Sequence, residues 1–431
     1  MKNDPKIINA WCLYDWANSV YSLVISSTLF PIYYNAVTQS PQTKDHIEFL
    51  GFSITNTVLY SFALSFSFFL IAAISPFLSG IADYTGRKKQ FMRFFILVGS
   101  LSCIGLYFFN GQNIEYGILC TVLASAGFSG SLVFYNAFLP EIATPDRVDL
   151  VSAKGFGFGY IGSVLLLIFN LLTINFYTSF GFSTELNAVR FSFVLVGVWW
   201  ILFSSISLYF LPSTIKNVKE EKVGKKGYYE LVKVWKNFKH IRSMKLFLAA
   251  FFFYSAGVQT IMLLAATFGN KELHLPGSKL ILAILIIQLV AILGSYLFAK
   301  LSARKGNKFS LSIMLIIWML ICLAAYFTSN EYQFYGIAFA VGLVMGGIQS
   351  LSRSTYSKLI PENTNDPTSY FSFYDVVEKI SIIIGTFGYG LLEYLTGSMR
   401  NSALLLELYF VIGFLFLLRL NSKFLYQKNN T

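Results

Sequence analysis

Three charged residues, Asp375, Glu378 and Lys379, lie close together inside an apolar stretch near the end of the chain. If that stretch is a membrane helix, each charge at its centre costs about 2.5–3.5 kcal/mol to insert, so a retained charge indicates function. Asp375 and Lys379 would share a helix face at i and i+4, with Glu378 on a different face. The trio could bind a substrate carboxylate, carry a coupling proton or exchange partners between conformations. The alternative is a permanent Asp375–Lys379 pair that only makes the helix insertable.

Further polar side chains are spread over other apolar stretches. Asp15 and Asn18 stand at i and i+3 near the start of the first one, where Asp15 is either a site residue or an interfacial charge favoured by the helix dipole. Arg353, at the end of the tenth, could pair with Asp15 or Asp375 as an inner gate, or could snorkel to the interface. Side chains that could hold an amino or carboxylate group, or could instead bond between helices, are Gln259, Gln288, Gln349, Tyr135 and Asn136.

The composition shows which elements position these groups. Of 431 residues, 55% are hydrophobic and only 13% are charged. Soluble domains carry about 25% charged residues, so this is a polytopic helical membrane protein. The formal charge of +12 sits between apolar stretches and reports topology rather than nucleic-acid binding. Neither the spacing of the four cysteines nor the loop positions of the three histidines suggest a metal site, and we expect no metal, cofactor or catalytic residue.

The apolar stretches number twelve and predict an all-α protein with twelve transmembrane helices. They cover residues 15–34, 55–79, 91–109, 116–138, 151–176, 189–211, 246–268, 278–301, 309–328, 334–353, 371–395 and 403–420.

Lys and Arg concentrate in alternate loops and in both terminal segments. By the positive-inside rule both termini are cytoplasmic, and we expect a multi-pass, monomeric protein of a bacterial inner (plasma) membrane. In the long basic segment 212–243, Leu231, Val234, Trp235 and Phe238 recur at helical spacing. This pattern favours an amphipathic helix on the inner leaflet, with a solvated linker as the alternative.

The two halves of the chain repeat. The segment 299–308 follows 79–88 by 220 positions with small, apolar, glycine and lysine positions in register, and Ile360-Pro361-Glu362 echoes Leu139-Pro140-Glu141. We therefore expect a six-helix bundle over 1–211, a linker over 212–243 and a second six-helix bundle over 244–431. Such repeats are typical of transporters that hold substrate between two halves near the membrane midplane.

The stretch from Ser79 to Lys88, SGIADYTGRK, resembles the G-x-L-A-D-R-x-G-R-K motif of the major facilitator superfamily. Gly86 allows a tight turn, and Asp83 could meet the N-terminus and cations of a neighbouring helix to lock the outward-open state. Arg87 and Lys88 complete the gating motif. Ser79 replaces the first glycine and stays small, whereas Tyr84 replaces a basic residue and weakens one contact.

Further stretches resemble one subgroup, the vacuolar effluxer (autophagy-related) and bacterial "unknown major facilitator" family. They are YDWANS at 14–19, FLPE at 138–141 and GGIQSLSRS at 346–354. The resemblance implies a twelve-helix fold with a central cavity and, from vacuolar members, amino-acid efflux.

The leading hypothesis is a secondary transporter that moves a small polar solute, such as an amino acid, by alternating access. A coupling proton would have to use Asp15, Asp375, Glu378 or Glu393, since no histidine lies in a predicted span. The alternatives are an exporter of a sugar, nucleoside or drug, a membrane-embedded enzyme, or a sensor that does not transport.

Overall fold

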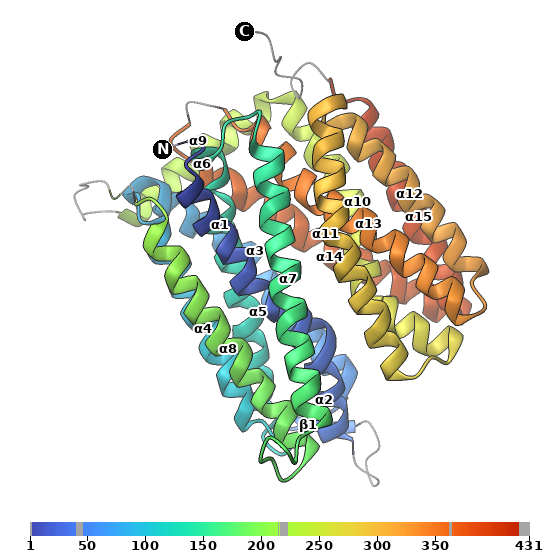
Figure 1. The fold of residues 1–431 in the computed structure, drawn as a ribbon. Coiled ribbons are helices and arrows are strands. Elements are labelled where there is room, and N and C mark those ends of the chain that lie inside the picture. Colours follow the sequence, from blue (N-terminus) through green and yellow to red (C-terminus); the bar gives the residue numbers. More distant parts are fainter. Residues whose placement is uncertain (1, 40–45, 214, 216–222, 362–363, 422–431) are drawn as a thin grey trace.

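The computed structural model describes residues 2–39, 46–213, 215, 223–361 and 364–421, and nearly all of them lie in helices (Figure 1). The first helix is continuous through α1 (Pro5–Val20), the π-helical η1 (Tyr21–Leu29) and α2 (Phe30–Thr38). It is followed by α3 (Asn56–Thr85), α4 (Lys88–Gly105) with the short η2 (Leu106–Phe108), α5 (Ile114–Asn136), α6 (Leu139–Ile142), α7 (Val148–Asn175) and α8 (Glu185–Phe210).

After the linker helix α9 (Val223–His240) come α10 (Arg242–Leu273), α11 (Gly277–Lys305), α12 (Asn307–Phe327), α13 (Glu331–Leu359), α14 (Pro367–Thr396) and α15 (Met399–Leu418). A two-stranded hairpin, β1 (His46–Phe49) and β2 (Phe52–Thr55), precedes α3 and was not predicted.

Eleven helical segments of the described chain are long and apolar enough to cross a membrane. The remaining predicted span, the eleventh at 371–395, corresponds to α14, which has the necessary length of 30 residues but carries Asp375, Glu378, Lys379 and Glu393. The predicted all-α membrane fold of twelve spans is confirmed. These charged side chains lower the mean hydropathy of α14. Charges inside a membrane span usually face the interior of the protein rather than the lipid.

The helices form two bundles with separate hydrophobic cores. Helices α1–α8 make one core between Ile8 and Leu211, and α9–α15 supply almost all of the other. In Figure 1 the blue-to-green helices gather on one side of the molecule and the yellow-to-red helices on the other. We call α1–α8 the N-terminal bundle and α10–α15 the C-terminal bundle.

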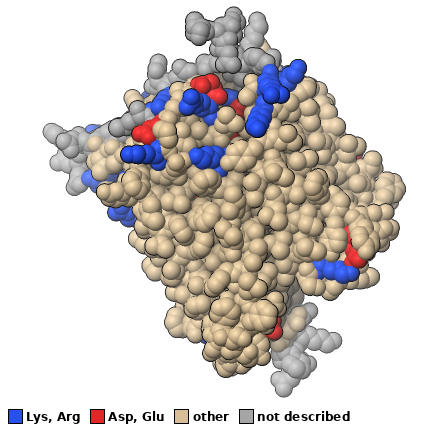
Figure 2. Space-filling model, in the orientation of Figure 1, with Lys and Arg blue, Asp and Glu red and all other residues tan. Residues whose placement is uncertain are grey.

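The start of α1, the end of α15 and α9 lie on one face of the molecule, here called the terminal face (Figure 1). In the view of Figure 2 most of the visible Lys, Arg, Asp and Glu gather at that face, and a broad band of uncharged surface lies beyond it. Large apolar side chains such as Phe62, Phe66 and Phe69 are more than half exposed. This surface suits a hydrocarbon environment.

The first helix begins ten residues earlier than predicted. Asp4 caps it by accepting a hydrogen bond from the Lys6 backbone N–H at 2.8 Å, and Pro5 occupies the first turn. Asp15 is therefore not at the helix end, so it is not an interfacial charge, and it is 5% exposed. The tenth span also continues past Arg353 to Leu359, which removes Arg353 from the interface.

Helix α9, which we expected to lie on the inner leaflet, packs across both bundles. Its Gly227 meets Gly80 of α3 so closely that a Cβ on Gly80 would lie 2.3 Å from the Gly227 carbonyl oxygen. Val234 is fully buried in the C-terminal core, and Trp235 packs on Phe373 of α14 with ring centroids 5.4 Å apart.

An ion pair adds to this docking. Lys233 donates to Asp366, just before α14, at 2.9 Å and to Glu230 at 2.9 Å. These hydrogen bonds, chiefly the one to Asp366, raise the pKa of Lys233 above its ordinary value. The apolar face of α9 is thus partly covered by protein, with Val234 fully buried and Trp235 still 44% exposed.

Candidate functional site

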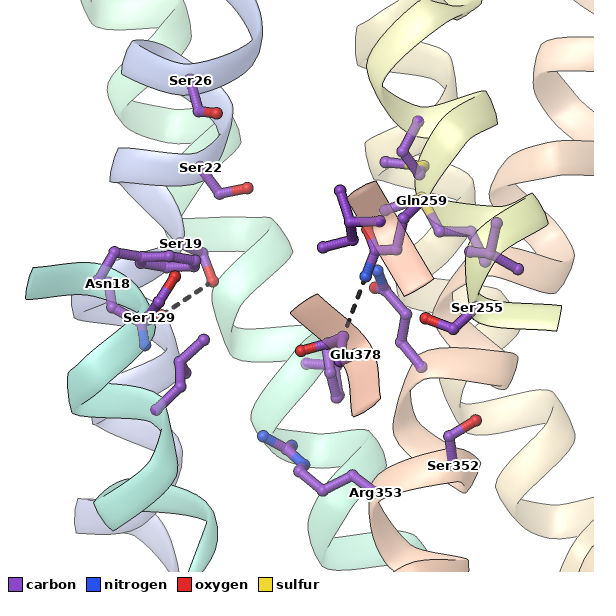
Figure 3. Close-up of a pocket in the computed structure, with 18 of the residues that line it drawn as sticks. Asn18, Ser19, Ser22, Ser26, Ser129, Ser255, Gln259, Ser352, Arg353 and Glu378 are labelled. Atoms are coloured by element: carbon purple, nitrogen blue, oxygen red, sulfur yellow. Dashed lines mark hydrogen bonds between the residues drawn. The ribbon is translucent and has the colours of Figure 1, made fainter. Parts of the chain in front are cut away.

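A cavity of about 250 Å³ lies between the two bundles. Its walls come from α1, η1, α3, α5 and α7 on one side and from α10, α11, α13 and α14 on the other. Figure 3 shows polar side chains of both bundles facing this space. The volume is below the roughly 300–1,000 Å³ of drug-sized sites, so it fits a small solute.

Hydroxyl and amide groups dominate the polar part of the lining. They include Asn18, Ser19, Ser22, Ser26, Ser27, Ser125, Ser129, Asn136, Ser163, Ser255, Gln259, Gln288, Gln349 and Ser352. Three of these serines lie in the π-helical turn η1, a kind of irregularity that is frequent at functional sites. Pro31, which lacks a backbone N–H, lies shortly after this turn and was the sequence signal for a disturbed helix.

Two residues of the α14 trio, Glu378 and Lys379, line the same cavity. Lys379 Nζ lies 3.4 Å from Asp375 Oδ1 and 3.2 Å from Glu378 Oε2, and both Lys379 and Asp375 are buried. Glu378 also accepts a hydrogen bond from Gln259 Nε2 at 3.3 Å. Lys379 therefore bridges both carboxylates, so the two acids are not separated as their different helix faces suggested.

On the terminal-face side, the cavity ends at a buried ion pair. Arg353 Nη1 and Nη2 lie 3.2 and 3.1 Å from Asp15 Oδ2, and the two side chains are only 4% and 6% exposed. Tyr135 donates its hydroxyl to the same oxygen at 2.7 Å. We call this group the Asp15 lock. Of the two partners considered for Arg353, the structure brings Asp15 to it and leaves Asp375 with Lys379.

The rest of the Arg353 guanidinium is also occupied. Nε donates to Ser152 Oγ at 3.0 Å, Nη2 to the Ser152 carbonyl at 2.9 Å and Nη1 to Asn136 Oδ1 at 3.5 Å. The rings of Trp11 and Phe156 lie 4.6 and 4.2 Å from the guanidinium carbon. A cation so enclosed is held by hydrogen bonds and by aromatic faces together.

A glycine makes room for the Asp15 lock. A Cβ on Gly155 of α7 would lie 2.4 Å from Asp15 Oδ2 and 3.0 Å from Arg353 Nη2. Gly159 and Gly162 continue the same face of α7 against Ser19 and Trp16 of α1. The glycine-rich segment of α7 thus serves close helix packing.

The remaining predicted amides are placed as follows. Gln349 accepts a hydrogen bond from the Tyr160 hydroxyl at 2.7 Å, which joins α13 to α7. Gln288 of α11 is buried, and its Oε1 has no hydrogen-bond partner among the described residues.

Asp83 lies at the N-terminus of a helix from the other bundle, as the motif predicted. It accepts hydrogen bonds from the backbone N–H groups of Thr368 and Ser369 at 3.2 and 2.7 Å and from Ser369 Oγ at 2.7 Å. These donors begin α14, where the helix dipole favours a negative charge. We call this group the Asp83 lock.

Other motif residues support the same corner. Gly86 ends α3 with a φ of 69°, in the left-handed region that glycine tolerates, and Arg87 is the N-cap of α4. Ser79 is buried and donates its hydroxyl to the Pro76 carbonyl at 2.8 Å. Lys88 forms an ion pair with Glu141 and lies over the Phe138 ring.

A third contact between the bundles was missed at the sequence level. Asp149, in the first turn of α7, accepts hydrogen bonds from Ser302 Oγ at 2.9 Å, Asn307 Nδ2 at 2.9 Å and Lys358 Nζ at 2.6 Å. We call this group the Asp149 lock. The internal repeat carried a signal for it. Position 303, the counterpart of Asp83 in the second half, is alanine, so an acid at the corresponding corner has to come from another helix.

The hydrogen bonds and ion pairs described between the two bundles all lie beside the cavity or on its terminal-face side. The bundles diverge towards the opposite face in Figure 1. Within the described part of the chain, no group of three or more His, Cys, Asp or Glu could hold a metal ion. The arrangement suits reversible binding of a small polar molecule.

Comparison with known proteins identifies the family, because the family model described as "Vacuole effluxer Atg22 like" matches residues 3–424. The chain belongs to the vacuole effluxer Atg22-like family.

Two relatives illustrate the range of this family. The chain is 33% identical to the uncharacterized MFS-type transporter YxiO of Bacillus subtilis (strain 168), an alignment that covers 97% of this chain and 95% of that one. It is 26% identical to autophagy-related protein 22 of Saccharomyces cerevisiae over 80% of this chain and 74% of the yeast protein.

A solved structure supports the fold. FucP, a major facilitator superfamily transporter in the outward conformation, matches with a TM-score of 0.66 at 15% identity and covers 99% of both chains. This Atg22-like protein is therefore a multi-pass integral membrane protein and an MFS-type transporter, as the motif at Ser79–Lys88 predicted.

Proposed function

We propose that this protein is a secondary transporter that exports a small polar solute, with amino acids as the substrate class, by alternating access of the cavity. The observation that carries the proposal is a small polar cavity between two bundles, closed on the terminal-face side by the buried Asp15 lock. The description of the family as vacuole effluxers supports the direction, and the amide and hydroxyl lining supports a polar substrate.

The two bundles act as the moving units, 1–211 and 244–431, joined by the linker 212–243. The excess of Lys and Arg in the loops of the terminal face supports a cytoplasmic position for that face in a bacterial plasma membrane. With the locks closed there, the state described is the one that releases an exported solute to the outside.

Opening towards the cytoplasm requires the Asp15 lock to separate. A buried charge that loses its partner costs about 3–5 kcal/mol if it stays dry. Because opening admits water to this end of the cavity, Asp15 and Arg353 would be hydrated as they part. Closing the cavity then costs the free energy of desolvating both charges. The lock thus links closure to the exclusion of water.

A coupling proton would use Asp375 or Glu378. These are the carboxylates beside the cavity that share one lysine, so protonation of either would release Lys379 to the other. Glu393 is a weaker candidate because it pairs with Lys271 at 3.0 Å and does not line the cavity.

The test is uptake of radiolabelled solutes by proteoliposomes preloaded with the same unlabelled solute, across amino acids, sugars and nucleosides. We expect exchange of amino acids by the wild type and its loss in Lys379→Ala and Asp375→Asn, with both variants still folded in the membrane. Exchange of sugars or nucleosides alone would replace the substrate class. Wild-type exchange by either variant would remove that residue from the mechanism.

A further inference from the structure

The wall of the cavity formed by α14 carries an excess of negative charge. Lys379 is flanked by two carboxylates, Asp375 and Glu378, and its side chain is only 5% exposed. The other ionised groups that line the cavity, Asp15 and Arg353, neutralise each other. Lys379 thus already has two negative partners. Asp375, Glu378 and Lys379 together carry one negative charge that no described positive group beside the cavity balances.

Glu378 is the carboxylate of this trio that a solute can reach. Its side chain is 21% exposed, whereas that of Asp375 is 6% exposed, and Glu378 lines the cavity. Among the described residues its Oε1 accepts a hydrogen bond from the neutral amide of Gln259 only. A carboxylate offers about four acceptor positions, so Glu378 retains capacity for another donor.

The opposite wall presents hydrogen-bond donors without charge. Asn18 Nδ2 and Ser129 Oγ are buried, at 2% and 1% residue exposure, and neither has a hydrogen-bond partner among the described residues. The Tyr14 hydroxyl lies beside Asn18, but the two do not meet hydrogen-bond geometry. Figure 3 places Asn18 and Ser129 on the side of the cavity opposite Glu378.

Buried polar groups without partners are costly, so unpartnered groups on residues that line a cavity indicate where a ligand completes them. An ammonium group supplies both the missing positive charge and the donors that Glu378 can accept. A carboxylate supplies the acceptors that Asn18 and Ser129 lack. Arg353 cannot serve that carboxylate, because Asp15, Ser152 and Asn136 occupy its guanidinium.

We propose that the cavity binds a zwitterion in one orientation, with its ammonium group on Glu378 of the C-terminal bundle and its carboxylate on Asn18 and Ser129 of the N-terminal bundle. This inference rests on the proposed transport of amino acids. It makes Glu378 the residue that selects the ligand, whereas Lys379 positions the two acids. A ligand held in this way touches both bundles, as a substrate of alternating access must.

The test compares three ligands that share one side chain, measured by the thermal stabilisation of the purified protein. Leucine is the zwitterion, leucinamide keeps only the ammonium group and N-acetylleucine keeps only the carboxylate. An aliphatic side chain suits the apolar part of the lining, which includes Val258, Met262 and Ile382. We expect leucine to bind best, leucinamide more weakly and N-acetylleucine not at all, because its acid faces a net negative wall.

Two sets of variants test the ammonium and carboxylate ends of the ligand separately. Glu378→Gln should weaken leucine and leucinamide alike, by about tenfold to a hundredfold, which is the usual range for a hydrogen bond to a charged group. Asn18→Ala and Ser129→Ala should weaken leucine and leave leucinamide unchanged. Glu407→Gln makes the same chemical change on α15, outside the cavity, and should alter neither.

The outcomes distinguish this inference from the proposed function. If leucine binds the wild type and N-acetylleucine binds equally well, or if Glu378→Gln retains leucine affinity, the orientation is wrong and amino-acid transport stands. If no amino acid stabilises or exchanges, the substrate class and the orientation fall together.

Discussion

At the scale of single residues, the pairing of Asp15 with Arg353 is the contact that must separate in the transport cycle proposed above. A buried ion pair often adds little to the free energy of unfolding, because desolvation offsets the attraction. The ion pair instead raises the free energy of any dry state in which the two residues are apart, because neither charge is then compensated. This property fits a contact that must be either fully made or fully hydrated.

We predict that Asp15→Asn and Arg353→Met each lower the thermal stability of the purified protein, at a cost of about 3–5 kcal/mol, because each leaves the other charge buried without its partner. The double variant Asp15→Asn/Arg353→Met should recover a substantial part of that loss. The measurement is thermal unfolding in detergent for the four members of the cycle. Additive losses in the double variant would mean that the two residues act separately.

Sequence analysis proposed the two partners but misplaced both. The apolar pattern began at Asp15 because the preceding residues include Lys6, Asn9 and Asp4. Hydropathy alone missed the stronger local signal, an N-capping aspartate followed by proline. At Arg353 the prediction stopped at a charge, although the proline that ends the helical pattern comes at position 361. Hydropathy measures how well a segment suits lipid. It therefore places the end of a helix too early where a charged residue is paired inside the protein.

At the scale of elements, the glycines of α7 set how closely this helix approaches α1 and the Asp15 lock. We predict that Gly155→Ala destabilises the closed state by about 1–3 kcal/mol, because its methyl group would overlap Asp15 Oδ2. The readout is the melting temperature together with the affinity for the transported solute.

Gly336→Ala on α13 is the matched control, because a Cβ there meets nothing within 4 Å. This control should behave as wild type or gain slightly from its better helix propensity. Equal effects at both positions would assign the loss to the helix backbone and not to the lock.

The number and order of the twelve spans followed from the sequence, whereas the surroundings of α9 did not. The period of Leu231, Val234, Trp235 and Phe238 identifies an apolar face, but it does not say whether lipid or protein covers that face. The close contact of Gly227 with Gly80 depends on the packing of two segments far apart in the chain. The Asp149 lock was missed for the same reason, because its four residues come from four different helices.

At the scale of the whole molecule, the Asp83 and Asp149 locks join the two bundles at two corners of the terminal face. Loss of either charge should favour opening on that side, since each aspartate accepts three hydrogen bonds there. A shift of about 1.4 kcal/mol changes the ratio of the two states tenfold. The order of ligand affinities should not change, because neither residue lines the cavity.

We predict faster labelling from the terminal face in Asp83→Asn and Asp149→Asn, by about tenfold each. A cysteine at Ser255 in the cavity, in a chain whose four native cysteines are replaced, reports the access of a membrane-impermeant maleimide. Asp146→Asn, an exposed acid of the same face, is the control. Unchanged labelling together with altered ligand selectivity would contradict the assignment of the locks.

The acids of all three locks come from the N-terminal bundle, and the groups that donate to them across the interface come from the C-terminal bundle. The closed interface is therefore asymmetric, with acceptors on one bundle and donors on the other, although the two bundles resemble each other in sequence. Two N-terminal bundles placed face to face would oppose carboxylate to carboxylate at every lock, and two C-terminal bundles would oppose donor to donor. Bundles made as separate polypeptides should accordingly find only their complementary partner, and a symmetric pair of identical six-helix ancestors must have closed by other contacts.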